Sequence, residues 1–209
     1  KSKNLLKKKF ILELKEVKNI LKKDPPIRML DGFEKLSPKK ALKIYDILLY
    51  LKKNKKIDRF GYSIYLFKYL KKICKNFKPD ILQCPYSIID RRLEKKSLLK
   101  YLKFNKIEVH VRSIFLQGLL VVDPLKLPKK FLKWKKIFQK FSKSMSDHQV
   151  SNLSGCLNFV QNNKYIDQIL IGVDNIKQLK EIRNIKTNKK IKYPNIFSKN
   201  DKLINPSKW

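Results

Sequence analysis

The sequence predicts an α/β fold with a parallel sheet, of the (β/α)-barrel type, and three observations lead to this prediction. Short apolar runs alternate five times with stretches of helical spacing, and one further helix precedes them. The runs expected as strands are short and apolar, as expected when both faces of a sheet are covered. Only five glycines occur in 209 residues, and neither GxGxxG nor GxxxxGK[ST] is present, which argues against a doubly wound nucleotide-binding fold.

Each expected element is bounded by residues that start or stop regular structure. A helix predicted over Leu5–Leu21 ends before a Pro-Pro pair, and a strand over Ile27–Leu30 ends at Asp31-Gly32. Ser37 is a typical N-cap, and the proline after it suits the first position of a helix that runs to about Lys53. The later strands are predicted at Ile57–Ser63, Ile81–Cys84, Ile107–Val111 and Ile166–Ile171, and the later helices at Leu66–Asn76, Leu93–Phe104, Pro128–Phe141, Asp147–Asn162 and Asn175–Arg183.

The C-terminal end differs in composition from the rest of the chain. From Ile185 onward Lys, Asn, Pro and Ser dominate, and we expect this stretch to be poorly ordered. The chain is therefore predicted to divide into residues 1–184, an incomplete barrel, and residues 185–209, a Lys/Asn-rich tail.

The formal net charge of +34 arises from 51 basic and 17 acidic residues, which makes nucleic acid or an anionic surface a candidate partner. Only six of the basic residues are Arg, the side chain that specific phosphate and base contacts favour, and the Lys residues are spread along the whole chain. A basic, non-catalytic polyanion binder remains the alternative function.

The cysteines and the longest apolar run exclude several classes of protein. Cys74, Cys84 and Cys156 are widely spaced and match no metal-ligand pattern, so we expect no metal site and three reduced thiols in a cytoplasmic protein. No signal peptide is recognisable. The apolar run Ile114–Val122 is interrupted by Gln117-Gly118 and is far shorter than the ~20 residues of a membrane span, so no membrane partner is expected.

Small and polar residues follow the expected strands, at the edge where a (β/α) barrel binds its ligands. They are Asp31, Ser63, Gln83, Arg112-Ser113 and Gly172-Val173-Asp174. An amide, two hydroxyls and a guanidinium on one face would suit a ligand that carries a carboxamide and phosphates.

Four stretches of the chain resemble, in order, successive blocks of the aldo/keto reductases. They are KKIDRFGYSIY (Lys55–Tyr65), PDILQCPYSIIDRR (Pro79–Arg92), IEVHVRSIFLQGLL (Ile107–Leu120) and IDQILIGVDNIKQLKEI (Ile166–Ile182). The third block is most similar to a bacterial branch with RS-FLQGLL after the seventh strand. The resemblance covers the C-terminal part of the family only, so it implies a partial (β/α)8 TIM barrel with strands 4–8 and without strands 1–3.

The resemblance also implies an NAD(P)H-dependent oxidoreductase that interconverts carbonyls and alcohols, with NADP as the usual cofactor and NAD possible, and a carbonyl substrate that the sequence does not identify. By position in the family pattern, Ser63 and Gln83 would hold the nicotinamide carboxamide, and Arg112 would lie beside the ring. Ser113 and Leu116 would lie along the pyrophosphate. The residues implied at the adenosine end are Gly172, Val173, Asp174 and Gln178, with Lys177 and Lys180 as candidates for a 2′-phosphate. For Tyr86, Asp90 and Arg91, contact with ligand and a place on the pocket rim both stay open.

The chain departs from the family pattern where the chemistry would occur. No segments matching the catalytic Asp, Tyr and Lys are found, and Asp31 stands where the family usually has His, so no catalytic residue is assigned. Arg28 is also unexpected in the interior of a barrel. These departures fit a fragment, a decayed homologue, or a subunit that another chain completes, and we expect the chain alone to be inactive.

Overall fold

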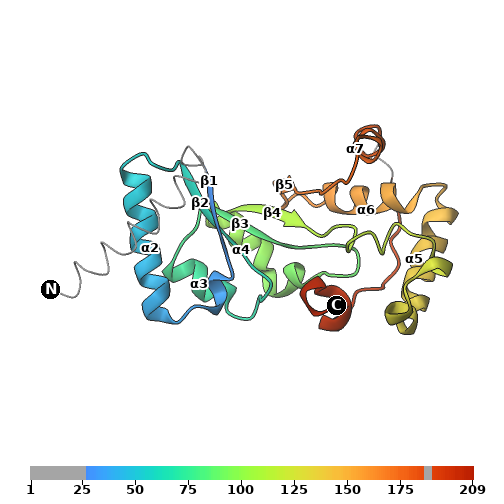
Figure 1. Cartoon of the computed structure of the whole chain (residues 1–209), viewed down its shortest axis with the longest axis horizontal. Helices are drawn as coiled ribbons and strands as arrows, with labels where there is room; N and C mark the ends of the chain where they lie inside the picture. The colour runs from blue at the N-terminus through green and yellow to red at the C-terminus, as the bar shows by residue number, and fades with distance from the viewer. Residues whose placement is uncertain (1–26, 186–189) are drawn as a thin grey trace.

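Five parallel strands form one sheet in which each strand pairs with the next along the chain. The computed structural model describes residues 27–185 and 190–209, so the helix expected at Leu5–Leu21 lies outside the described residues. The strands are β1 (Ile27–Asp31), β2 (Arg59–Ser63), β3 (Ile81–Pro85), β4 (Glu108–Arg112) and β5 (Gln168–Ile169). Parallel strands in sequence order, with helical crossovers between them, make this a partial barrel (Figure 1).

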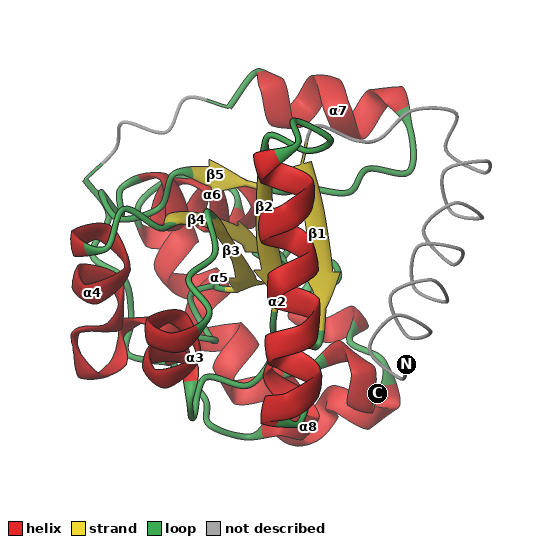
Figure 2. Ribbon diagram, turned by 90° about the vertical axis from the view of Figure 1, so that its left-hand side faces the viewer, coloured by secondary structure: helices red, strands yellow, loops and turns green. Residues whose placement is uncertain are grey.

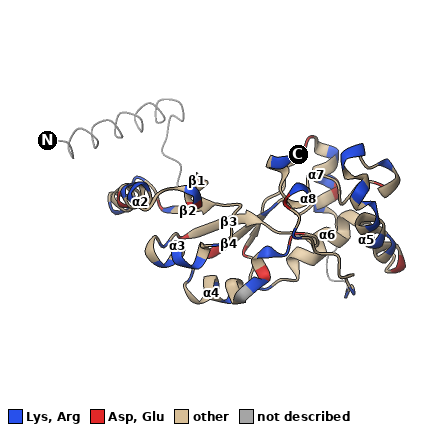
Figure 3. Ribbon diagram, turned by 90° about the horizontal axis from the view of Figure 1, so that it is seen from below, with Lys and Arg blue, Asp and Glu red and all other residues tan. Residues whose placement is uncertain are grey.

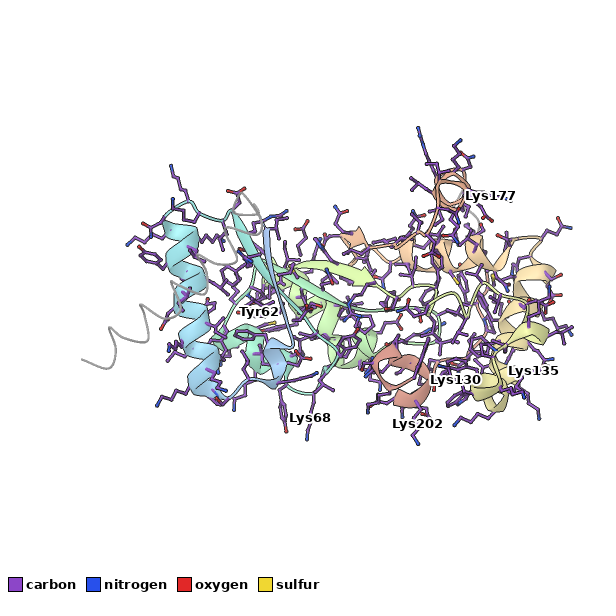
Figure 4. The ribbon with its side chains drawn as sticks, in the orientation of Figure 1. Tyr62, Lys68, Lys130, Lys135, Lys177 and Lys202 are labelled. Atoms are coloured by element: carbon purple, nitrogen blue, oxygen red, sulfur yellow. The ribbon has the colours of Figure 1, made fainter. Side chains whose placement is uncertain are left out.

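Helices and short 3-10 turns cover one face of the sheet. The connections contain η1 (Phe33–Lys35), α2 (Pro38–Lys53), α3 (Leu70–Asn76), η2 (Arg92–Ser97) and α4 (Leu98–Phe104). In Figure 2, α2 lies in front of β1 and β2, with α3 and α4 beside it. Their apolar side chains bury the outer face of the strands, where Tyr62, Leu82 and Val109 have no exposed surface. Figure 4 shows Tyr62 in this interior, while the labelled lysines lie at the periphery.

The opposite face of the sheet is polar and partly open. The strand register aligns Asp31, Ser63, Gln83, His110 and Gln168 in one row across all five strands. Register partners in a parallel sheet point to the same side, so this row lies on the inner face of the barrel. Asp31 and Gln168 are exposed, and Gln83 and His110 are half-buried. The inner face is therefore more polar and more accessible than the outer face, as expected for the side of a barrel that meets a ligand.

The second half of the chain builds a separate apolar cluster beside the sheet. The helices and 3-10 turns in this half of the chain are η3 (Pro124–Lys126), η4 (Lys129–Trp134), α5 (Lys135–Asp147), α6 (Asn152–Gln161), α7 (Ile176–Arg183), α8 (Asp201–Ile204) and η5 (Pro206–Lys208). Phe138, Phe141 and Met145 of α5 pack in this cluster against Ile88 and Ile89, which follow β3. Lys and Arg side chains are distributed over α2, α3, α5 and α8, with few acidic positions between them (Figure 3).

The expectation of a poorly ordered tail is wrong for residues 190–209. Leu203 and Ile204 have no exposed surface, and Ile196 is 5% exposed, because all three pack in the cluster around α5. The Ser198 N–H donates to the Ile89 carbonyl at 2.8 Å, and Trp209 packs edge-on against Phe131. A few well-placed apolar residues therefore order a segment whose composition is mostly polar.

Most predicted elements are present, with differences at their ends. The helix expected at Leu93–Phe104 is divided, because Ser97 takes a left-handed conformation with φ 54° between η2 and α4. The strand expected at Ile166–Ile171 shortens to Gln168–Ile169. Arg28, a residue type that is unexpected in a barrel interior, lies on the outer face of the sheet. Its register partner is Phe60 of the buried outer face, and the strand alternation puts it opposite Asp31.

The three cysteines are buried and unpaired, and they are expected to resist alkylation in the folded protein. Burial raises the pKa of the Cys74 thiol to about 12 and also raises the pKa of Cys84 and Cys156. Few thiolates therefore exist at pH 8. Mass spectrometry after iodoacetamide treatment at pH 8 should find no modified cysteine in buffer and three in 8 M urea. Rapid modification of any one of them in buffer would contradict the burial.

Candidate cofactor site

A cavity of about 770 Å³ opens beside the carboxyl end of β4. One wall is the loop that follows β4, and the other runs from β5 into α7. Six of the nine residues predicted for cofactor binding line it: Arg112, Ser113, Gly172, Val173, Asp174 and Gln178. Two segments more than fifty residues apart in sequence are thus brought to one cavity by the parallel pairing of β4 with β5.

The loop after β4 has an unusual backbone. Ser113 has φ 59°, and the consecutive residues Leu116, Gln117 and Gly118 have φ 49°, 52° and 84°. Left-handed conformations are costly for residues other than glycine, so a run of three marks a strained turn of the kind that gathers at functional sites. Hydrogen bonds hold the turn, with Leu116 N–H donating to the Ser113 carbonyl at 2.9 Å and Val121 N–H to the Gly118 carbonyl at 2.9 Å.

This turn leaves backbone donors without protein partners. Within residues 27–185 and 190–209, the N–H groups of Gln117 and Gly118 donate to no acceptor, and both residues line the cavity. Successive N–H groups in a left-handed turn form a concave donor site that suits an anion. The wall after β4 therefore offers the cavity hydrogen-bond donors.

Arg112 adds the positive charge on the same wall. Its guanidinium lies 4.0 Å from the centre of the Tyr65 ring, and one Nη donates to the Ile64 carbonyl at 3.2 Å. Both partners follow β2, so Arg112 reaches across the end of β3. A guanidinium that is stacked on a ring and anchored by one donor keeps its other N–H groups for a ligand. Arg112 is the one Lys or Arg among the described residues that line the cavity.

The wall from β5 to α7 carries acceptors instead. Asp174, Gln178 and Glu181 line the cavity, and both carboxylates are exposed. The Asn175 side chain caps α7 by accepting from Gln178 N–H at 3.0 Å, and the Gln178 side-chain oxygen accepts from Asp174 N–H at 2.8 Å. These bonds fix the start of α7 against the cavity. Glu181 was not predicted as a site residue, although its position one helical turn after Gln178 could have indicated it.

Three predicted residues lie outside the cavity lining. Ser63 and Gln83 are register partners on the inner face, at the row that begins with Asp31. They lie beside the segment that holds Arg112, since the Ile64 N–H donates to the Gln83 carbonyl at 2.9 Å. Leu116 is 1% exposed and packs in the cluster around α5, because the left-handed turn directs its side chain away from the cavity. Leu116 therefore does not line the cavity.

Residues of the PYSIIDRR turn brace the structure rather than line the cavity. Tyr86 is 1% exposed, donates to the Glu94 carboxylate and accepts from the Asn163 amide at 3.0 Å. Asp90 is 2% exposed and pairs with Arg92, and the Arg91 guanidinium lies over the Phe159 ring. None of the three lines this cavity, so their contacts indicate a supporting position, which differs from both alternatives left open by the sequence, ligand contact and the pocket rim.

Other kinds of site have little support in the part of the chain that is described. Its residues contain no group of three or more His, Cys, Asp or Glu side chains that could hold a metal ion. None of its helices has the length and apolar character that a bilayer crossing requires.

Comparison with models of protein families shows to which family the chain belongs. The model of the aldo/keto reductase family matches residues 22–193. The chain belongs to the aldo/keto reductase family. Within that family the matched region includes all five strands and both walls of the cavity. No curated protein sequence matches this member of the family significantly.

Solved structures of aldo/keto reductases share the fold at low sequence identity. The holo form of an aldo-keto reductase from Bacillus halodurans superimposes with a TM-score of 0.67 and 19% identity, over 86% of this chain and 61% of that one. A thermostable aldo-keto reductase bound to the inhibitor epalrestat gives 0.64 and 15%, over 90% and 63%. The glycerol dehydrogenase of Gluconobacter oxydans gives 0.57 and 16%, over 84% and 63%. The chain thus spans about 60% of the length of these structures, which agrees with a partial barrel.

Proposed function

We propose that the chain provides the nicotinamide dinucleotide site of an NAD(P)H-dependent oxidoreductase of the aldo/keto reductase family. The observation that carries the proposal is the wall after β4, where Arg112 lines the cavity together with Gln117 and Gly118, whose N–H groups donate to no acceptor within residues 27–185 and 190–209. A guanidinium and a turn of backbone donors are the groups that bind phosphate oxygens. The segment Arg112–Leu120 also supports a place in the bacterial branch with RS-FLQGLL after the seventh strand.

The residues present fit such a cofactor in kind and arrangement. A cavity of about 770 Å³ lies within the range of sites that enclose small molecules and cofactors. Ser63 at the end of β2 supplies a hydroxyl, and its register partner Gln83 within β3 supplies an amide. Neither side chain forms a hydrogen bond among the described residues. An amide and a hydroxyl can pair with both the N–H₂ and the carbonyl of a carboxamide.

The chain's own residues would bind and orient rather than transfer protons. When bound, a nicotinamide supplies the hydride for carbonyl reduction. Arg112, which the family resemblance implies beside the nicotinamide ring, would also neutralise charge on the adjacent phosphate. Tyr65 would hold the guanidinium in place. Asp31 occupies the exposed end of the polar row, and its side chain contains no N–H group. Asp31 therefore cannot supply the N–H that a histidine would present at this position.

Calorimetric titration of the 209-residue chain with NADPH and NADH is expected to show saturable binding to at least one of them. Arg112→Ala should weaken that binding at least about tenfold, because a charge-assisted hydrogen bond contributes roughly 1.5–3 kcal/mol. Lys133→Ala removes an exposed cation that does not line the cavity and is the matched control. The same preparation should reduce no simple aldehyde with NADPH.

Two results would contradict the proposal in different ways. If neither dinucleotide binds, the proposal that the chain provides a cofactor site is contradicted. Steady-state aldehyde reduction by the 209-residue chain would show that it holds a proton donor which the sequence pattern does not reveal. Equal loss of affinity in the Arg112 and Lys133 variants would show that bulk positive charge, rather than the cavity wall, attracts the dinucleotide.

A further inference from the structure

We infer that the cavity is built for NAD(H) and discriminates against the 2′-phosphate of NADP(H). This inference rests on the proposed function, because it concerns which dinucleotide the proposed site accepts. Its basis is the unequal chemistry of the two walls. The wall after β4 holds the cavity's one described cation and the free backbone donors, whereas the α7 wall presents Asp174, Gln178 and Glu181.

The two carboxylates of the α7 wall are free to act on a ligand. Neither Asp174 nor Glu181 forms an ion pair with another residue of the described chain, and both are exposed. The side-chain oxygen of Gln178 is already used to accept from the Asp174 N–H. This wall therefore carries two carboxylates that form no ion pair with another described residue.

The division of donors and acceptors sets the placement of a dinucleotide. Its pyrophosphate is an acceptor and would lie against Arg112 and the left-handed turn, which supply donors. The ribose and base beyond the pyrophosphate would then meet the α7 wall. A carboxylate accepts hydrogen bonds from ribose hydroxyls, which is how acidic residues select NAD in other dinucleotide folds, but it repels a phosphate in the same place.

The basic residues of α7 do not reverse this preference. Lys177 and Lys180 were the sequence-based candidates for a 2′-phosphate contact, yet neither lines the cavity and both are exposed. Figure 4 shows Lys177 on α7 at the outer edge of the molecule. The net charge of the whole chain attracts both dinucleotides, and it attracts NADP(H) more strongly because of the extra phosphate. Salt screens this long-range attraction, so the two affinities are compared at 150 mM NaCl.

The experiment compares NADH and NADPH by calorimetric titration of the 209-residue chain at 150 mM NaCl. The wild-type chain should bind NADH at least tenfold more tightly than NADPH. Glu181→Gln should bring the dissociation constants of NADH and NADPH closer together, chiefly by tightening NADPH binding. Glu181→Lys should make NADPH the more tightly bound dinucleotide. Asp58→Asn is the matched control, because it removes an exposed carboxylate at the start of β2, at the opposite end of the strands, and should leave the ratio unchanged.

Each outcome bears on one claim. Tighter binding of NADPH by the wild-type chain, or an unchanged ratio in both Glu181 variants, would overturn the inference and leave the proposed dinucleotide site standing. A ratio that shifts equally in the Asp58 control would also overturn it, since the effect would then come from net charge. Failure of both dinucleotides to bind would overturn the proposed function, and the inference with it.

Discussion

Replacing Asp90 with Ala is expected to lower the free energy of unfolding by about 3–5 kcal/mol, because it leaves a buried guanidinium without its partner. The Asp90 side chain is 2% exposed and that of Arg92 is 15% exposed. Two parallel bonds of 2.8 Å join Nε and one Nη of Arg92 to the two carboxylate oxygens. Arg92 also donates to the Tyr65 carbonyl and stacks over the Phe67 ring. Asp90 thus fixes the Arg92 guanidinium, and Arg92 in turn joins the turn after β3 to the segment after β2.

Urea denaturation followed by circular dichroism would measure this effect. Asp201→Asn is the matched control, because Asp201 lies 3.6 Å from the same guanidinium but is 44% exposed. An exposed ion pair contributes at most about 1 kcal/mol, so the control should change little. The double variant Asp90→Leu with Arg92→Met removes both charges and should recover part of the loss. A stability loss in Asp90→Ala no larger than in the Asp201 control would show that the pair is not structural.

Replacing Gly61 with Ala is expected to destabilise the sheet by about 3 kcal/mol, because β2 approaches β3 too closely for a methyl group. A Cβ atom at Gly61 would lie 2.5 Å from the Ile81 carbonyl oxygen and 2.7 Å from the Met29 Sδ. The thioether can move, but the carbonyl belongs to the backbone of β3 and is the register partner of the glycine. The strands would have to separate at the centre of the sheet.

Gly172→Ala is the matched control for this variant. Nothing lies within 4 Å of a Cβ at Gly172, and its φ is not in the left-handed region, so the change should stay within about 0.5 kcal/mol. Chemical denaturation of both variants, with the slope of the transition compared to the wild-type chain, would separate them. Similar midpoints for Gly61→Ala and the wild-type chain would show that the strands can adjust at no cost.

The sequence predicts the sheet well because its strands are marked locally. Four apolar runs became β1 to β4 with small changes at their ends, and two of them, Ile27–Leu30 and Ile81–Cys84, are bounded by Pro and Asp. The last run, Ile166–Ile171, has the same composition, yet β5 contains two residues and pairs with β4 alone among the described strands. Strand length depends on neighbours on both sides, and an apolar run carries no information about which neighbours are present.

The prediction that the chain after Ile185 is poorly ordered is wrong for a related reason. Its apolar residues are too sparse to show a period, and their burial depends on a surface formed by α5 and the turn after β3. Composition describes what a segment can do alone, whereas this segment is ordered by what it docks against. The left-handed turn at Leu116–Gly118 is hidden in the same way, because two of its three residues are not glycine.

The candidate site was predicted in outline from the ends of strands. Arg112 and Asp174 reach the cavity because parallel strands bring their carboxyl ends to one edge, which spacing alone can indicate. Leu116 was assigned by its place in the family pattern, and the turn instead directs its side chain into the core. Glu181 was missed because the resemblance drew attention to the basic residues of the same helix, and only the packing of α7 shows which of its sides meets the cavity.

The packing of residues 196–204 against Ile88 and Ile89 has a consequence for biosynthesis. Ribosomes add roughly 5–20 residues each second, so the partners of Ile88 and Ile89 emerge about 5–20 s after them. During that interval the nascent chain exposes the apolar surface that Leu203 and Ile204 will cover. Such surfaces are what chaperones bind and what drives aggregation. A translation product that stops before Ile196 would keep that surface exposed, and we expect it to be recovered with chaperones or in the insoluble fraction.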